Sequence, residues 1–407
     1  MGYREYIEQG PMPSRDDMKK FLREQIKFER RYEFVDLYSA VNKVAGEDIK
    51  AKTVLPKLPV SKMDGIAVRF ADFNSEFVDT ANWQEGKEYI FANTGCIVPS
   101  KYDTVILIED VRFIDGKLKV LESPVKKGQF IDPPESLIAK DEVLVRKYEK
   151  ITPPQVGLLA SGGVKEVKVL KRPRLVFIPT GDELVSWQEE NYPVDKNVES
   201  NSMMLEAFAK IYDADLTVFK IVPDDKIAIK EALVKASEIA DVILINAGSS
   251  KGTKDFNLDL LGAEGQIFVY ELGCRPGKHS SYSEFLNKPV LGLAGPPNGA
   301  ELAMRFYVKS IVDAYYHQAE NHVDKVKAIL DFAFSAPDNA DFCLQVHVFE
   351  GKDGRYHAKL INPKAVTRAY LLHNYNAFMY VPKKMSLKVG QEFVAELIVD
   401  RKAIGRI

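Results

Sequence analysis

The sequence predicts a multidomain protein of α/β and β class, built on a central three-layer α/β domain with a parallel sheet. Between residues 172 and 321, apolar strand-like runs alternate with amphipathic helix-like runs. This alternation is typical of a parallel sheet with right-handed crossovers. Residues 51–141 and 322–407 instead carry short apolar runs separated by turn residues, which indicates small β domains.

At 407 residues the chain is too long for one ordinary core, so we expect several domains. Residues 1–50 and 142–171 are predicted to form an elongated N-terminal domain of helical and extended segments. Residues 51–141 are predicted to be a β domain inserted into it. The α/β domain is expected at residues 172–321, and a C-terminal domain resembling a β-barrel at residues 322–407.

The individual elements are predicted from apolar spacing and capping residues. Residues 15–30 are expected to form a helix, because apolar residues recur on one face and Ser14 is a good N-cap. Residues 32–49 are expected to begin as a second short helix, and prolines open a helix after Thr152. Further strands are expected at 65–68, 89–92, 104–108, 174–178, 215–222, 241–246 and 288–293, and helices at 201–212, 224–239 and 300–316.

Composition excludes several classes of function. The net charge is −2, with 56 Lys and Arg residues spread along the chain against 58 Asp and Glu residues. Because no basic excess exists to neutralise a nucleic-acid backbone, a small-molecule partner is favoured over a polymer. We expect no membrane partner, because no apolar run is long enough to cross a bilayer. We also expect a reducing, cytoplasmic location, because the start lacks an apolar signal segment.

Cys274, Cys343 and His279 lack the spacing of zinc ligands or of a catalytic triad, which favours structural roles for these three residues.

Glycine-rich and charged residues follow the predicted strands of the α/β domain, at the edge where open parallel sheets bind ligands. In the loop 246–255, glycines and serines allow the backbone to approach an anion such as phosphate. Asp255 adds a carboxylate suited to a divalent cation. An ordinary loop with a helix-starting aspartate is the alternative. The anion-binding residues in this hypothesis are Gly248, Ser249, Ser250 and Gly252.

Other charged residues have two interpretations each. The cationic side chains of Arg275 and Lys278 flank a Pro-Gly turn and are able to face one anion, but a solvated turn with two unrelated charges fits as well. Asp182 and Glu183 follow the first strand of the α/β domain, either as ligands or as acids at a helix N-terminus. Asp64 precedes a glycine, which by itself indicates a turn.

Several motifs in colinear order resemble the molybdopterin molybdenumtransferase family, the group that includes the E domain of gephyrin. The segment Leu58-Pro-Val-Ser-Lys-Met-Asp-Gly-Ile-Ala-Val-Arg69 resembles a family segment that ends in Ala-Met-Asp-Gly-Tyr-Ala-Val-Arg. Also similar to family motifs are Asn93-Thr-Gly-Cys96, Gly157-Leu-Leu-Ala-Ser-Gly-Gly163, Pro179-Thr-Gly-Asp-Glu-Leu184 and Ser200-Asn-Ser202. The resemblance extends across essentially the whole chain.

The resemblance implies a transferase that inserts molybdenum from molybdate into the dithiolene of adenylated molybdopterin, with Mg²⁺, and releases AMP and active cofactor. It also implies an elongated homodimer whose cleft combines the α/β domain of one subunit with the β domain of the other. The molybdopterin adenylyltransferase is a further candidate partner. The implied catalytic residues are Asp64, Glu183 and Asp255, and the implied metal ligands are Asp224 and Asp255. The implied substrate-binding residues are Thr94, Gly181, Asp182, Gly248, Ser249, Ser250, Gly252, Arg275 and Lys278.

The sequence departs from the family pattern where the oxyanion is expected. The family's Ser-Gly-Gly-Val-Ser-Val-Gly loop is here Asn246-Ala-Gly-Ser-Ser-Lys-Gly252, and its Lys-Pro-Gly-Lys-Pro is Arg275-Pro-Gly-Lys-His279. Its Pro-Gly-Asn-Pro-Val-Ser is Ala294-Gly-Pro-Pro-Asn-Gly299, so a serine hydroxyl is missing. Its Arg-rich Gly-Glu-Asp segment is Asp132-Pro-Pro-Glu-Ser-Leu137, and Asn339 stands where the family often has an arginine.

These departures leave more than one functional hypothesis open. The first is an active molybdenumtransferase with a divergent oxyanion site. The second is a non-catalytic dimeric relative that binds molybdopterin or acts as a scaffold protein. The third is a molybdopterin-binding module that acts on another nucleotide substrate.

Overall fold

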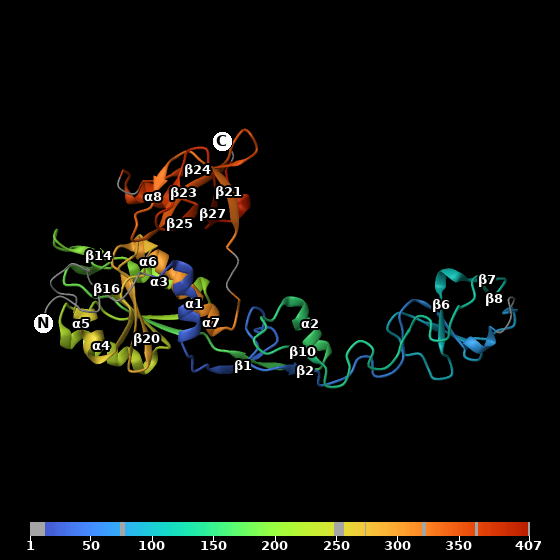
Figure 1. Ribbon diagram of the computed structural model, residues 1–407. Coiled ribbons are helices and arrows are strands. Elements are labelled where there is room, and N and C mark those ends of the chain that lie inside the picture. Colours follow the sequence, from blue (N-terminus) through green and yellow to red (C-terminus); the bar gives the residue numbers. More distant parts are fainter. Residues whose placement is uncertain are drawn as a thin grey trace. The chain divides into compact units, whose positions relative to one another are not determined.

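The chain forms two compact units, which we describe from a computed structural model (Figure 1). Unit 1 comprises Met1–Arg31 and Lys171–Ile407, and unit 2 comprises Tyr32–Leu170. The structure describes residues 13–73, 78–247, 256–272, 274–319, 323–362 and 365–405.

The described part of unit 2 contains short strands and one α-helix. The strands are β1 (Tyr32–Asp36), β2 (Ile49–Lys50), β3 (Val60–Ser61), β4 (Gly65–Val68), β5 (Tyr89–Ala92), β6 (Thr104–Leu107), β7 (Val111–Ile114), β8 (Lys117–Val120), β9 (Ile131–Asp132), β10 (Val143–Val145) and β11 (Glu166–Leu170). The α-helix is α2 (Pro153–Ser161), and η2 (Phe70–Asp72) and η3 (Ile108–Asp110) are 3₁₀ turns.

Strand β4 is the central strand of a three-stranded sheet in unit 2. It pairs antiparallel with β5 on one side and β6 on the other, and its residue Ile66 is fully buried in the core beneath them. Gly65 begins β4 very close to β6. A Cβ at Gly65 would lie only 1.9 Å from the carbonyl oxygen of Ile106, so this position accepts no side chain.

The predicted helix at the start of residues 32–49 is wrong. Tyr32–Asp36 is instead strand β1, which pairs antiparallel with β11 along its whole length. The local pattern was too short to decide between helix and strand, and pairing with a distant segment decided it. The helix expected after Thr152 is confirmed as α2, which begins with Pro153.

The sheet of unit 1 confirms the predicted alternation of strands and helices. The strands of unit 1 are β12 (Arg174–Ile178), β13 (Leu184–Ser186), β14 (Asn197–Glu199), β15 (Asp215–Val218), β16 (Val242–Ala247), β17 (Gln266–Val269), β18 (Cys274–Arg275), β19 (Ser281–Phe285), β20 (Lys288–Ala294), β21 (Lys325–Leu330), β22 (Phe334–Ser335), β23 (Asp341–Glu350), β24 (Tyr356–Leu360), β25 (Ala377–Val381), β26 (Ser386–Leu387) and β27 (Glu392–Leu397). The order in the six-stranded sheet is β15-β12-β16-β20-β19-β17. The first four strands are parallel, and β19 alone runs antiparallel to its neighbours.

Helices cover the sheet of unit 1 to form three layers (Figure 1). They are α1 (Arg15–Gln25), α3 (Asn201–Ile211), α4 (Lys226–Ile239), α5 (Phe256–Glu264), α6 (Pro297–Ala303) and α7 (Lys309–Tyr315), with a π-helical turn η4 (Met304–Val308) between α6 and α7. A further helix, α8 (Arg368–Asn374), and the 3₁₀ turn η5 (Arg401–Ala403) lie in the C-terminal region. Leu233 of α4 packs with Val176 and Ile243 in a fully buried core on one face of the sheet.

Helix α1 is shorter than predicted. Ser14 caps it as expected, by accepting a hydrogen bond from the backbone N–H of Asp17. The helix ends at Gln25 rather than near residue 30, because the following chain is held to the end of α7. Arg30 donates from Nε to the carbonyl oxygen of Tyr315 over 2.8 Å.

The predicted C-terminal barrel is confirmed. Strands β23, β24, β21, β27 and β25 pair in sequence, and β25 pairs back with β23 to close the ring. A buried ion pair joins α1 to this barrel, since Arg15 Nη1 lies 2.7 Å from Glu396 Oε2. Strand β18 adds to β23 in parallel, which connects the α/β domain to the barrel at Cys274.

Gly65→Ala is expected to destabilise unit 2 by about 2–4 kcal/mol, because the added methyl group forces β4 away from β6. Gly157→Ala is the matched control. Gly157 is exposed within α2 and nothing lies within 4 Å of its Cβ position, so alanine is expected to stabilise the unit by about 0.5–1 kcal/mol. Thermal unfolding of the full chain measures both changes. A Gly65→Ala protein as stable as the parent contradicts the close β4–β6 contact.

Candidate active site

The turn after β12 brings a glycine and an acid to the carboxyl edge of the sheet. Gly181 has a φ of +146°, a conformation that residues with a side chain rarely adopt. A Cβ at Gly181 would lie 2.7 Å from Oε2 of Glu183, so the Glu183 carboxylate lies directly against this backbone. The N–H of Gly181 donates to the carbonyl oxygen of Val222 over 3.1 Å, which fixes the turn beside the segment that follows β15.

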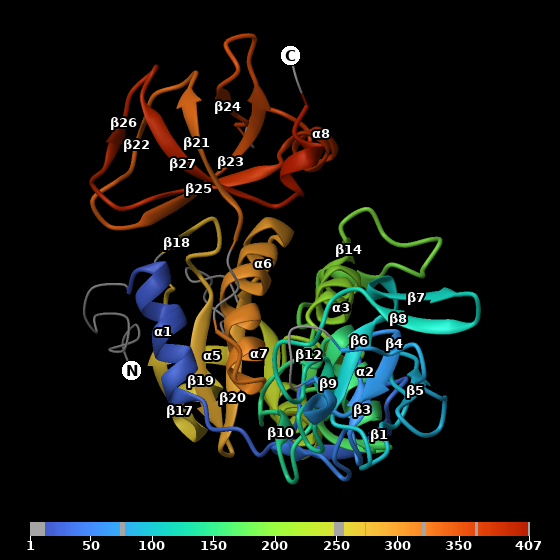
Figure 2. The same cartoon turned by 90° about the vertical axis from the view of Figure 1, so that its right-hand side faces the viewer.

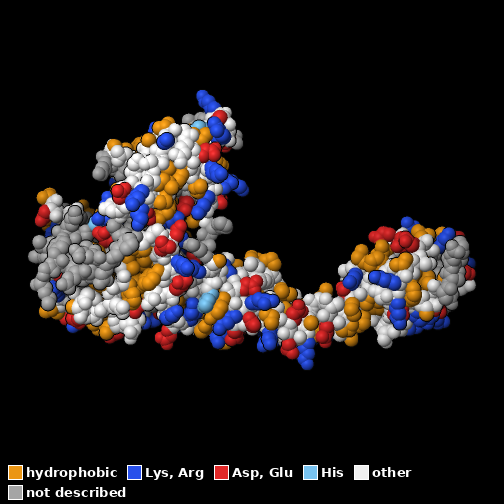
Figure 3. Space-filling view, in the orientation of Figure 1, with side chains coloured by type: hydrophobic (Ala, Val, Ile, Leu, Met, Phe, Trp, Pro, Cys, Tyr) orange, Lys and Arg blue, Asp and Glu red, His pale blue; other side chains and the backbone are white. Residues whose placement is uncertain are grey.

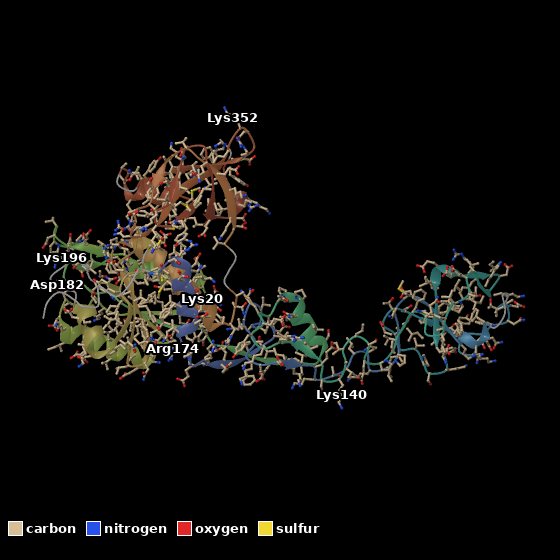
Figure 4. The ribbon with its side chains drawn as sticks, viewed as in Figure 1. Lys20, Lys140, Arg174, Asp182, Lys196 and Lys352 are labelled. Atoms are coloured by element: carbon tan, nitrogen blue, oxygen red, sulfur yellow. The ribbon has the colours of Figure 1, made fainter. Side chains whose placement is uncertain are left out.

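Asp182 and Asp224 are joined through each other's backbones. The N–H of Asp224 donates to Asp182 Oδ1 over 3.2 Å, and the N–H of Asp182 lies 3.5 Å from Asp224 Oδ2. Lys196 Nζ donates to the carbonyl oxygen of Asp182, and Figure 4 shows these two residues side by side. Two exposed aspartates that follow the neighbouring strands β12 and β15 therefore lie next to each other.

Asp225, the next residue, has a different role. Its Oδ1 accepts hydrogen bonds from the N–H groups of Ile227 and Ala228, over 3.0 Å and 2.9 Å. Asp225 is therefore the N-cap of α4, and Asp224 is the acid that meets Asp182.

Two asparagines connect the other strand ends. Asn246 Nδ2, in β16, lies 3.4 Å from the carbonyl oxygen of Thr180, and Asn201 Nδ2, in α3, donates to that of Gly295 over 2.9 Å. Strand β16, which ends at Ala247, lies between β12 and β20. The site residues predicted in this loop lie outside the described residues: Gly248, Ser249, Ser250, Gly252 and Asp255.

The cationic turn after β18 lies against the start of α6. Gly277 has a φ of +100°, and a Cβ there would lie 3.2 Å from the carbonyl oxygen of Gly299. Arg275 Cζ lies 5.8 Å from the ring centroid of Phe342 in the barrel. The turn is thus held between α6 and the barrel by close backbone packing and a cation–π contact.

Lys278 has an acidic neighbour within the protein. Its Nζ lies 3.5 Å from Glu271 Oε1, and Nδ1 of His279 lies 3.2 Å from the same oxygen. The hydrogen bond to His279, and then the charge of Lys278, hold the pKa of the Glu271 carboxyl below its usual range against the opposing effect of burial. The positive charge of Lys278 is therefore partly neutralised, and joint binding of an anion by Arg275 and Lys278 stays a prediction.

The acidic turn follows β12, whereas the cationic turn lies against the start of α6, the helix that follows β20. Both β12 and β20 pair with β16, and adjacent strands lie about 4.8 Å apart, so the two strand ends are about 10 Å apart. Among the described residues, no hydrogen bond or ion pair joins the two groups, and no three His, Cys, Asp or Glu side chains are grouped to hold a metal ion. The described helices also include none with the length and apolarity to cross a membrane.

In unit 2, Asp64 and Thr94 form one exposed pair. The N–H of Thr94 donates to Asp64 Oδ1 over 2.7 Å, and Thr94 Oγ1 donates to the same oxygen over 3.0 Å. These hydrogen bonds, the backbone one first, hold the pKa of the Asp64 carboxyl below its usual range. Asp64 does lie at the turn before β4, and the turn fixes its carboxylate beside Thr94.

Lys196 and Glu271 were not among the residues predicted from the sequence. Lys196 binds a backbone carbonyl group, a contact that leaves no motif in the sequence. Glu271 could have been predicted. The Pro-Gly turn reverses the chain, so the residues after the turn come close to an acid that stands shortly before it. The hydrogen bond from Leu272 N to the carbonyl oxygen of Lys278, 3.1 Å long, closes that loop. On the face in Figure 3, basic and acidic side chains are interspersed. A charged ligand is therefore attracted by a few nearby side chains and not by a large surface patch of one sign.

Thr94→Val is expected to raise the pKa of Asp64 part of the way to its ordinary value, because it removes the hydroxyl donor but keeps the backbone donor. Thr94→Ser keeps both donors and is the control, with an unchanged pKa. Carbon-detected NMR titration of the Asp64 carboxyl measures these values. An Asp64 pKa that is ordinary in the parent, or equal in all three proteins, contradicts the hydrogen-bonded pair.

Two family profiles match the chain. Residues 13–163 match the profile described as MoeA N-terminal region (domain I and II), and residues 176–314 match that of a probable molybdopterin binding domain. The chain is similar to a molybdopterin molybdenumtransferase of Haemophilus influenzae, with 27% identity over 311 residues, covering 73% of this chain and 76% of the relative.

Solved structures show the same architecture. A crystal structure of a molybdopterin biosynthesis MoeA protein from Pyrococcus horikoshii has a TM-score of 0.77 at 23% identity, covering 95% of this chain and 99% of that chain. A second structure, with the same description, has a TM-score of 0.72 at 25% identity, covering 95% and 100%. Together, the two profile matches and these similarities show that the chain belongs to the MoeA and gephyrin-like family.

Proposed function

We propose that this chain is a molybdopterin molybdenumtransferase in molybdenum cofactor biosynthesis. Its substrates are adenylated molybdopterin and molybdate, and its products are AMP and the molybdenum cofactor. Relatives of Haemophilus influenzae and a Nostoc species carry the name of this activity. The observation that carries the proposal is the pair of carboxylates, Asp182 and Asp224, at the carboxyl edge of the parallel sheet.

The acidic pair fits a magnesium ion shared with a substrate phosphate. Mg²⁺ in phosphate-processing sites is usually held by one or two carboxylates together with phosphate oxygens and water. One oxygen of each aspartate accepts a backbone N–H, and this fixes both carboxylates while the second oxygen of each stays outside these bonds. Bound there, Mg²⁺ supplies charge neutralisation for the phosphates of the adenylated substrate.

The neighbouring residues position the substrate. Because Gly181 has no side chain, the backbone at this position is able to approach the substrate phosphates closely. The carboxylate of Glu183 lies against the Gly181 backbone, beside the proposed phosphate position. Asn201 Oδ1 is buried without a hydrogen-bond partner among the described residues, so it is available to accept a donor from the pterin. Arg275 and Lys278 supply positive charge for the molybdate oxyanion.

The oxyanion side of the proposed site differs physically from the family pattern. Gly299 stands where the family has a serine. A Cβ at Gly299 would lie 2.8 Å from Cβ of Ala294 and 3.1 Å from Cα of Gly277, so the present turn leaves no room for that side chain. The contact of Lys278 with Glu271 weakens the same side electrostatically. These two observations favour the second candidate, a non-catalytic dimeric relative that binds molybdopterin or acts as a scaffold.

An activity assay separates the two candidates. Purified protein with Mg²⁺, molybdate and adenylated molybdopterin is expected to release AMP and active cofactor. Asp224→Asn is expected to lower the rate at least about 100-fold, because one of the two fixed carboxylates is lost. Asp225→Asn removes the same charge one residue away but keeps an N-cap, so its rate is expected to stay near that of the parent.

No turnover by the parent above a Glu183→Ala protein ends the transferase proposal. Restored molybdoenzyme activity in cells that lack their own insertase ends the scaffold proposal. Equal losses in Asp224→Asn and Asp225→Asn contradict the special role of the Asp182–Asp224 pair.

We further propose that the transferase works in the cytoplasm as a homodimer, with Asp64 and Thr94 of one subunit completing the site of the other. The family resemblance supports this arrangement. Adenylated molybdopterin requires an adenylyl-transfer reaction upstream, so the molybdopterin adenylyltransferase is the proposed supplier.

Mixed dimers test the shared site. Asp64→Asn and Asp224→Asn proteins are each expected to be inactive alone. Unfolded and refolded together, they are expected to regain about a quarter of the parent rate, because a mixed dimer holds one intact site. A mixture that regains nothing, or a chain that is monomeric in light scattering, contradicts a site shared between subunits.

A further inference from the structure

A cavity of about 640 Å³ lies in unit 1 between α1, the helical segment η4–α7 and the barrel strands β21, β25 and β27. It is separate from the candidate active site. The first residue of β14 donates a backbone hydrogen bond to Glu183 of the acidic turn, over 2.7 Å. Two ribbon views at right angles to each other both show β14 apart from α1 (Figures 1 and 2).

The charged residues at the cavity balance each other. Five basic and four acidic side chains line it, namely Arg15, Lys19, Arg305, Lys309 and Lys325, and Asp16, Asp313, Asp324 and Glu396. A fifth acid, Glu301, lies just outside the lining, with its Oε1 2.8 Å from Arg305 Nε. Because the two signs are present in equal number, neither an anion nor a cation finds an excess of opposite charge here.

The most buried of these charges are paired with one another. Arg15 binds Glu396 through two nitrogens, over 2.7 Å and 3.1 Å, and the two side chains are 6% and 11% exposed. Lys309 binds Oδ1 of Asp313. Taking one partner away from such a pair leaves the other charge buried and unpaired, which is strongly unfavourable. The cavity therefore favours a neutral ligand.

Two buried polar groups on α7 nevertheless lack partners. Ser310 Oγ and Asp313 Oδ2 make no hydrogen bond among the described residues, and both residues line the cavity. Ser310 is 1% exposed and Asp313 is 6% exposed. Leaving a buried polar atom without a hydrogen bond is unfavourable, so a ligand that supplies one is stabilised. The carboxylate oxygen requires a donor, whereas the serine hydroxyl is able to donate or to accept.

The spacing of these two groups suits one ligand with several hydroxyls. Ser310 and Asp313 are three residues apart on α7, so they are neighbours on one face of the helix, with about 5–6 Å between their Cβ atoms. Two hydroxyl groups on adjoining carbons are able to reach both residues. A hydroxyl group also meets either need, because it donates to Asp313 and donates to or accepts from Ser310.

Apolar side chains and a π-helical turn complete the cavity. Phe306 and Phe378 line it with their rings 6.3 Å apart, and Tyr212 lines it too. Phe306 belongs to η4, and π-helical turns are rare and are often found at functional sites. Pockets for small ligands are typically about 300–1,000 Å³ in volume and combine apolar walls with a few placed polar groups. The volume and lining of this cavity match that description.

We propose that this cavity binds a small neutral polyhydroxylated compound, of the class of monosaccharides and polyols. Its hydroxyl groups bond to Ser310 Oγ and Asp313 Oδ2, and its carbon skeleton packs on Phe306 and Phe378. The site goes beyond the proposed transferase activity and does not depend on it.

Isothermal titration calorimetry of the full chain with D-glucose and with myo-inositol tests the proposal. At least one of them is expected to bind with a Kd below about 1 mM. Its phosphate monoester is expected to bind at least about tenfold more weakly, because the cavity offers no excess positive charge to offset the phosphate.

Ser310→Ala tests the hydroxyl contact directly. It is expected to weaken binding by about three- to tenfold yet leave the Tm unchanged or slightly raised, because the deleted hydroxyl has no partner within the described residues. Ser237→Ala is the matched control. Ser237 is also buried in a helix, but its Oγ donates to the carbonyl oxygen of Val234 over 2.7 Å and it does not line the cavity. Its loss is expected to lower the Tm and leave binding unchanged.

Asp313→Asn tests the second contact, with an expected loss of about tenfold or more, because a hydrogen bond to a charged acceptor is lost. Circular dichroism checks that this variant is folded. No heat from either probe at about 10 mM overturns the proposal. A phosphate monoester that binds more tightly than its parent compound overturns it as well, because the cavity then prefers an anion. Affinity that is unchanged in Ser310→Ala and in folded Asp313→Asn has the same consequence.

Discussion

The hydrogen bonds that join Asp182 to Asp224 depend on the parallel pairing of β12 with β15. That pairing brings two separate loops to one edge of the sheet, where the bridge between Thr180 and Val222 continues it beyond both strands. Each aspartate then orders the backbone of the other. In the proposed function, this fixed geometry holds both carboxylates ready for one divalent cation.

The cationic side of the edge follows from a different constraint. Gly277 and Gly299 approach so closely that neither accepts a side chain in the present conformation. This contact positions the turn of Arg275 and Lys278 against α6. It also leaves no space at position 299 for the serine side chain of the family pattern. The same turn carries Glu271, which partly neutralises Lys278. The proposed divergence of the oxyanion side is therefore compatible with an intact acidic pair within one fold.

The sequence was sufficient to predict the strands and helices whose apolar residues recur at a regular spacing. Alternating apolar runs predicted β12, β16, β20 and the helices between them, because each run is long enough to show its period. It was insufficient for β1, whose five residues are defined by pairing with β11. The family resemblance pointed to Asp182 and Asp224 but not to their mutual hydrogen bonds, and contacts such as Lys278 with Glu271 depend on loop closure rather than on spacing. Asp255 itself lies outside the described residues.

The central claim is that Asp182 and Asp224 together hold a divalent cation at the phosphates of the substrate. Crystals grown with Mn²⁺ in place of Mg²⁺ and with adenylated molybdopterin test it through anomalous scattering from the metal. The predicted result is one anomalous peak in contact with both carboxylates and a phosphate oxygen. Anomalous peaks only at other positions, with substrate bound, contradict the account.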